Sequence, residues 1–155
     1  MDLSKFTIKS QEAVQAAQAK AIQYGHMEVD GEHLLLVLLD QPGGLASRLL
    51  QRMEIPAERV RERLEEELER KPRVSGPGIE PGKVYISQRV SKLLVQAQNE
   101  AKRLKDEYVS VEHLLLAFVD EGAATPAGRV LKEFQLTKDL LLKTLHEVRG
   151  RQRVT

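Results

Sequence analysis

Four histidines and their acidic neighbours are the side chains of this sequence best suited to bind a metal ion or to move a proton. His26 and His33 are seven residues apart, the chain has no cysteine, and no two histidines form a His-x-x-x-His pair. Zinc sites in proteins are usually built from cysteine and histidine at such close spacings. The sequence therefore predicts no metal site.

A Glu-His pair occurs twice, as Glu32-His33 and as Glu112-His113, each time at the start of an apolar run. An acid in the first turn of a helix interacts favourably with the free N–H groups there. We therefore favour a structural role for both pairs, at the start of a helix, over a chemical one.

Motifs that would bind a nucleotide or form a catalytic site are missing from the sequence. It contains no Gly-x-Ser-x-Gly, no P-loop and no Gly-x-Gly-x-x-Gly, and Gly76-Pro77-Gly78 lacks the residues that a phosphate-binding loop requires. We expect no catalytic residues, no cofactor and no enzymatic activity in this chain.

The sequence repeats itself at a distance of 80 residues, which indicates how the elements around these residues are organised. Residues 29–36 align with residues 109–116, and Asp40 aligns with Asp120. An apolar stripe with the spacing of one helix face aligns in the same way: Val14, Ala17, Ala21 and Tyr24 fall on Leu94, Ala97, Ala101 and Leu104. A tandem duplication is the simplest explanation.

Each repeat has the start signals of four helices. These are Thr7, Asp30, Gly44 and Pro56 in the first repeat, and Ser87, Ser110, Thr125 and Thr137 in the second. The second helix of each repeat is apolar on nearly all sides, so it must be central. We predict an all-α fold of two tandem, pseudo-symmetric repeats of about four helices each, over residues 6–70 and 87–149, forming one domain over residues 1–149. Prolines and glycines mark 71–86 as a linker, and the polar run 150–155 is interpreted as the start of another.

Composition excludes several classes of partner. The 155 residues carry 24 Lys and Arg against 23 Asp and Glu, too balanced for a protein whose main task is to bind nucleic acid. No apolar run approaches the roughly 20 residues needed to span a membrane. We expect a monomeric, cytoplasmic domain that binds neither nucleic acid nor membrane.

Four segments together carry a resemblance to a known family: Phe6-Thr7, the two Glu-His-Leu-Leu-Leu runs, residues 72–76 and residues 149–155. Over its whole length the chain resembles the N-terminal Clp repeat domains of the ClpB family of AAA+ disaggregating chaperones. The repeat motif alone is also similar to the N-domains of the ClpA and ClpC families.

The resemblance implies a mobile domain that collects unfolded or aggregated proteins for a hexameric, ATP-driven motor. ATP and Mg²⁺ would bind in modules of the parent that are not in this sequence, and the partners would be the rest of the hexamer and a heat-shock type co-chaperone system. One alternative is an adaptor-docking N-domain of a ClpA- or ClpC-type protease unfoldase. Another is an independent small helical enzyme.

The resemblance also implies a set of client-binding residues. By motif, functional positions of the family fall on Thr7, Asp106 and Glu112, and an apolar peptide groove maps onto Leu94, Tyr108 and His113. At His113 the sequence departs from the aliphatic residue that can stand there in the family. Structural roles remain open beside these: Thr7 as a helix cap, Asp106 at a helix end, and Glu112 as the acid of a helix start.

Overall fold

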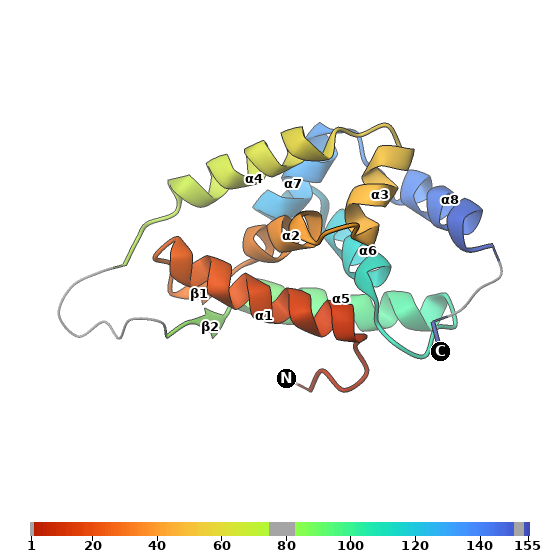
Figure 1. The fold of residues 1–155 in the computed structure, drawn as a ribbon, viewed down its shortest axis with the longest axis horizontal. Coiled ribbons are helices and arrows are strands. Elements are labelled where there is room, and N and C mark those ends of the chain that lie inside the picture. The colour runs from red at the N-terminus through yellow and green to blue at the C-terminus, as the bar shows by residue number, and fades with distance from the viewer. Residues whose placement is uncertain (1, 75–82, 151–153) are drawn as a thin grey trace.

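The computed structural model describes residues 2–74, 83–150 and 154–155, and most of them are helical (Figure 1). The first repeat contains α1 (Ile8–Gln23), α2 (Gly31–Asp40), α3 (Leu45–Arg52) and α4 (Ala57–Arg70). The second contains α5 (Gln88–Arg103), α6 (Val111–Glu121), α7 (Pro126–Glu133) and α8 (Lys138–Arg149), with a 3₁₀ turn at Gly122–Ala124. The all-α, two-repeat prediction is confirmed. Most of the predicted linker, residues 75–82, and most of the predicted tail, residues 151–153, lie outside the described residues.

The helices α1, α5, α7 and α8 each begin at a residue whose hydroxyl accepts a main-chain N–H of the first turn. The Thr7 hydroxyl accepts the N–H of Ser10 at the start of α1, and the Ser87 hydroxyl accepts the N–H of Val90 at the start of α5. Both helices end before a residue with left-handed backbone, Gly25 (φ +73°) after α1 and Lys105 (φ +60°) after α5. Because their ends match, α1 and α5 have the same length of 16 residues, and each is followed by the same kind of turn.

The core is centred on α2 and α6, as their apolar sequences predict. Leu34, Leu35 and Leu38 of α2 and Leu114 and Phe118 of α6 are at most 1% exposed. Figure 1 shows α1 and α5 along one side of this pair, with α3, α4, α7 and α8 on the other side. Residues 32–39 of α2 and 111–118 of α6 are accordingly all buried.

The two repeats exchange their leading segments. β1 (Glu28–Val29) pairs in parallel with β2 (Tyr85–Ile86), so that Val29 of the first repeat lies opposite Ile86 of the second. The reciprocal contact is a parallel bridge between Phe6 and Val109. Because Phe6 aligns with Ile86 and Val29 with Val109, each repeat lends the segment before its first helix to the other. The sequence analysis did not predict these short pairings.

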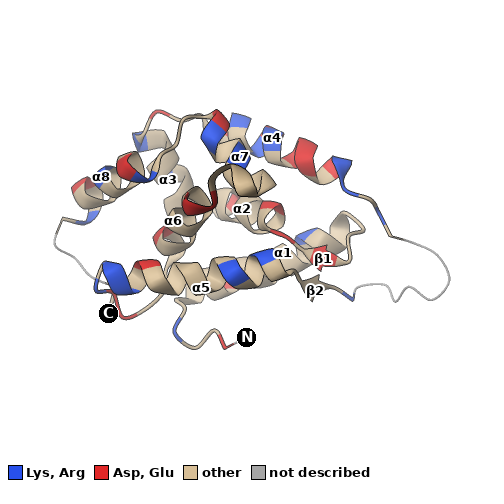
Figure 2. Cartoon of the chain, turned by 180° about the vertical axis from the view of Figure 1, so that it is seen from behind, with Lys and Arg blue, Asp and Glu red and all other residues tan. Residues whose placement is uncertain are grey.

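Ion pairs on the outer surface also connect the repeats. Arg63 of α4 binds both carboxylate oxygens of Glu133 in α7 at 2.9 Å, and Figure 2 shows alternating basic and acidic bands along α4. The opposite edge of α4 is apolar and buried, through Val60, Leu64 and Leu68. No helix among the described residues is long and apolar enough to cross a membrane.

Candidate functional site

A groove of about 290 Å³ lies where the two repeats meet. It is formed by the start of α1, the connection from α2 to α3 and the start of α6, and its lining residues are Thr7, Lys9, Arg48, 41–45 and 110–112. Pro42, Leu45 and Val111 give it apolar walls, and Lys9 and Arg48 add positive charge. Two of the residues that the resemblance implied, Thr7 and Glu112, lie in this lining.

Behind the groove is a buried polar cluster of the second repeat, built around His113. The His113 Nδ1 atom accepts the N–H of Ser110 at 2.8 Å, which leaves the ring proton on Nε2. This Nε2–H donates to Asp106 Oδ2 at 2.6 Å, and neither side chain has any exposed surface. His113 therefore caps α6 and holds Asp106 in place at the same time.

Asp106 is the most heavily bonded side chain of this cluster. Its Oδ1 accepts from Arg149 Nη2 at 2.6 Å and from the main-chain N–H of Val154 at 2.8 Å. Burial would raise the pKa of Asp106, but the hydrogen bonds from Arg149, Val154 and His113 outweigh it and hold that pKa below its usual range. Asp106 is thus a fixed anion and does more than end a helix turn.

Glu112 connects the cluster to the groove. Its carboxylate accepts a short hydrogen bond from the Ser110 hydroxyl, and Arg149 Nη1 lies 3.6 Å from its other oxygen. Arg149 therefore bridges Glu112, which lines the groove, and Asp106, which holds Val154. These contacts come in addition to the favourable position of Glu112 at the start of α6.

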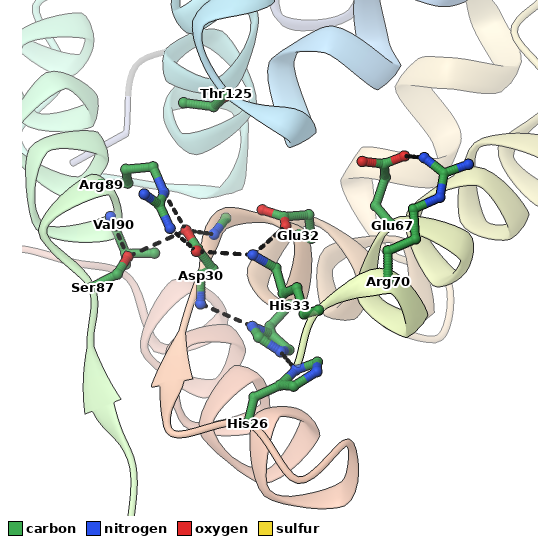
Figure 3. Close-up of polar contacts among 12 residues, drawn as sticks. His26, Asp30, Glu32, His33, Glu67, Arg70, Ser87, Arg89, Val90 and Thr125 are labelled. Atoms are coloured by element: carbon green, nitrogen blue, oxygen red, sulfur yellow. Dashed lines mark hydrogen bonds and ion pairs between the residues drawn. The ribbon is translucent and has the colours of Figure 1, made fainter. Parts of the chain in front are cut away.

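The first repeat has a counterpart cluster with different chemistry (Figure 3). His33 Nδ1 accepts the N–H of Asp30 at 2.8 Å, and its Nε2 faces Nδ1 of His26, which stands where Asp106 does, also at 2.8 Å. Asp30 binds Arg89 and Lys71, and these cations hold its pKa far below the usual range against the effect of burial. A neutral pair of histidines thus replaces the ionised Asp106 contact.

Besides Asp30, the pKa of His33 and that of Glu121, a residue of α6 near Asp30 and Glu32, are strongly shifted. Burial, His26 and Lys71 lower the pKa of His33 to about 4. Burial and the nearby charges of Asp30 and Glu32 raise the pKa of Glu121 to about 7. Within the part of the chain that the structure describes, no group of three or more histidine, cysteine or acidic side chains is placed to hold a metal ion.

The structure corrects the expected position of the apolar groove residues. Leu94 is 0% exposed and packs in the core, because it lies on the inward face of α5 together with Ala97 and Ala101. His113 is also 0% exposed, because it serves as the buried cap of α6. Tyr108 alone of the three reaches the surface, with 36% exposure and the Lys5 ammonium 5.8 Å from its ring centre. The expectation that Leu94 and His113 line an exposed groove is wrong for this structure.

Two members of the cluster, Arg149 and Val154, were missed by the sequence analysis. Arg149 is the last residue of the predicted second repeat, and Val154 lies in the segment 150–155 interpreted as the beginning of a linker. For Arg149, the sequence offered one signal: a basic residue stands at the end of the last helix in both repeats, Lys71 after α4 and Arg149 at the end of α8.

Comparison with known proteins identifies the family. Residues 5–134 match the Clp repeat (R) N-terminal domain. The chain is 50% identical over 155 residues to the chaperone protein ClpB of Nitratidesulfovibrio vulgaris, and 45% identical over 155 residues to that of Bacillus anthracis. In both cases the match covers 100% of this chain and 18% of the relative, so the chain spans about a fifth of the length of these relatives.

Solved structures show the same fold at lower identity. The N-terminal domain of Hsp104 from Candida albicans is 22% identical with a TM-score of 0.79, covering 97% of this chain and 95% of that one. The N-domain of ClpV from Vibrio cholerae is 19% identical with a TM-score of 0.80, covering 99% and 90%. The matched domain and the shared fold agree, and this chain belongs to the Clp repeat (R) N-terminal domain family, with ClpB chaperones among its curated relatives.

Proposed function

We propose that this domain recognises unfolded or aggregated polypeptide for a ClpB-type disaggregase and binds it weakly in the groove between the repeats. The observation that carries the proposal is the composition of this groove, in which Thr7 and Glu112 from opposite repeats flank the apolar side chains of Pro42, Leu45 and Val111. Apolar walls with charged neighbours fit the side chains of an unfolded segment, which a folded protein keeps buried.

The size of the groove favours weak binding. A volume of about 290 Å³ is at the lower end for a small-molecule pocket, so only a few side chains of a client can be buried at once. Weak binding suits a domain that must pass its client to a motor. The hexameric parent, its ATP-driven translocation, a co-chaperone system of the heat-shock type and a cytoplasmic location are parts of this proposal.

A fold relative gives independent support for a peptide as the ligand. One solved structure is a complex of a ClpV N-domain with a VipB peptide, and that domain is 18% identical to this chain with a TM-score of 0.72. The fold is thus able to present a peptide-binding surface.

The proposal is tested by NMR titration of the labelled domain with reduced, carboxymethylated α-lactalbumin, which is permanently unfolded. We expect shifts at Leu45, Val111 and Glu112, and no shifts with the native, disulfide-bonded form. Leu45→Ala should weaken binding about tenfold, because a buried aliphatic contact of a few methylene groups is lost.

The matched control is Val95→Ala on α5, which removes an apolar side chain that is 48% exposed and lies outside the groove. This variant should bind the unfolded client as the unaltered domain does. Loss of binding with Val95→Ala but not with Leu45→Ala would reject the groove. Binding of a folded adaptor without any response to unfolded protein would favour the adaptor-docking alternative.

A further inference from the structure

The chain after α8 returns to the polar cluster of the second repeat. The N–H of Val154 donates to Asp106 Oδ1 at 2.8 Å, and the carbonyl of Val154 accepts from the N–H of Glu107 at 2.7 Å and from that of Tyr108 at 3.4 Å. Figure 1 shows the C-terminal residues next to the end of α5, where this loop begins. Val154 is thus held through both its main-chain N–H and its main-chain carbonyl.

Only main-chain atoms of Val154 take part in these hydrogen bonds. The receiving groups, in contrast, are fixed: Asp106 has no exposed side-chain surface and is held by Arg149 and His113. Any residue with a free N–H and an extended backbone can make the same contacts, whatever its side chain. Such a receptor is independent of sequence.

Among the described residues, the first repeat lacks this receptor. His26 stands in place of Asp106, and the returning residue Val74 donates its N–H to the carbonyl of Gly25 at 2.9 Å instead of to a carboxylate. The neighbouring carbonyl of Met27 is occupied by the N–H of Tyr85 at 2.9 Å, next to the β1–β2 pairing. The carboxylate receptor is therefore a feature of the second repeat.

This receptor adjoins the proposed client groove. The N–H of Thr7, which lines the groove, donates to the carbonyl of Val109 at 2.9 Å, directly after Tyr108. On the inner side, Arg149 contacts both Asp106 and the groove residue Glu112. The groove and the receptor are therefore neighbours, joined through Thr7 on one side and through Arg149 on the other.

We propose that Asp106 and the N–H groups of Glu107 and Tyr108 form a second contact point for the main chain of an extended client, which the domain fills with its own Val154 in the absence of a client. Release of Val154 opens this contact point, so Val154 competes with the client. This inference rests on the proposed function, because it assigns a further contact and its regulation to the same client.

The test compares Val154→Pro, which has no N–H to donate, with Val154→Ala, which keeps both main-chain groups. The probe is a short, uncharged peptide of Val, Ser and Gln with blocked ends, titrated into each labelled variant. If the receptor is open in about a tenth of the molecules, freeing it raises the apparent affinity by up to about tenfold. We expect a gain of about threefold or more for Val154→Pro over Val154→Ala. In the unaltered domain, we expect the amide of Val154 to exchange faster when peptide is added.

A peptide with the same side chains in which every main-chain nitrogen is methylated provides the ligand control, since it has no main-chain N–H to donate to Asp106. It should bind both variants equally. Equal affinities of the two variants for the unmodified peptide, or peptide shifts at Leu45 and Val111 with the amides of Glu107 and Val154 unchanged, would overturn this inference and leave the groove proposal standing. Absence of shifts at the groove as well would reject both.

Discussion

Replacing His26 by aspartate should give the first repeat the contact that the second repeat already has. His33 Nε2 faces His26 Nδ1 at 2.8 Å, and the equivalent His113 Nε2 faces Asp106 Oδ2 at 2.6 Å. The acceptor atom is three bonds from Cα in both side chains, so an aspartate can reach His33 without a change of backbone. We predict that His26→Asp removes the acid sensitivity of the first-repeat cluster.

The sign of this sensitivity follows from the pKa of His33. Its pKa is about 4 in the folded chain against an ordinary value of 6.5, so between these values the unfolded chain binds a proton that the folded chain does not. Stability is therefore complete above pH 6.5 and is lost as the pH falls toward 4. From pH 7 to pH 5 these two values give a loss of about 2 kcal/mol in the free energy of unfolding.

Glu121 acts in the opposite direction over the same range. Its pKa is raised from 4.5 to about 7 in the folded chain, so the folded chain takes up a proton first as the pH falls from 7 to 5. Glu121 is only partly buried, so solvent screening reduces this gain to less than about 2 kcal/mol of stability on acidification, which still offsets much of the loss at His33. The measurement therefore needs a Glu121→Gln background, in which the hydrogen bond from Thr125 can still form.

Urea unfolding at pH 7 and pH 5 measures the effect as a difference between two variants. Glu121→Gln should lose about 2 kcal/mol more stability on acidification than Glu121→Gln combined with His26→Asp, because the other carboxylates contribute equally to both. His146→Asp, at an exposed position of α8, should leave the loss unchanged. An equal loss with and without His26→Asp would refute the explanation through the histidine pair.

Three further outcomes are expected for the stability of the domain, each measured as the free energy of unfolding in urea. Leu94→Ala should cost about 2–5 kcal/mol because the side chain is fully buried, whereas Val95→Ala should cost less than about 0.5 kcal/mol. Similarly small costs for both variants would mean that Leu94 is not a core residue. Thr7→Ala should cost about 1 kcal/mol through loss of the cap of α1, and Thr7→Ser should restore it. Arg63→Ala should cost less than about 1 kcal/mol despite its two bonds to Glu133, because the pair is partly exposed; a larger cost would mean that this pair holds α4 on α7.

The repeats and their helix ends could be predicted because they depend on local chemistry. Thr7 and Ser87 satisfy free N–H groups a few residues away, and the apolar segments at 34–39 and 114–118 have only one stable place in a helical domain, its centre. The strand pairings could not be predicted, because two residues carry no periodic pattern and their partners lie far away in sequence.

The candidate site was predicted only in part for the same reason. Thr7, Asp106 and Glu112 were found by resemblance, whereas Arg149 and Val154 join them through contacts 43 and 48 residues away along the chain from Asp106. Leu94 was wrongly assigned to the groove, although its alignment with Val14 already indicated a core position. Both positions belong to an inward-facing apolar stripe. An apolar stripe that occurs in both repeats is better explained as part of the core than as a binding surface.

The exchange of leading segments explains why the candidate site belongs to both repeats. Thr7 caps α1 of the first repeat, yet its N–H binds Val109 of the second, and Ser87 likewise caps α5 while its N–H binds Val29 and its hydroxyl lies 3.3 Å from Asp30. Each first helix thus begins on the polar cluster of the other repeat. Neither repeat alone can satisfy these main-chain groups or form the groove, because the lining residues Thr7 and Glu112 come from different repeats. The proposed binding of a client therefore depends on the folding of the whole domain. The two halves also differ in charge, because the polar cluster of the first repeat holds neutral histidines and that of the second holds an ionised aspartate.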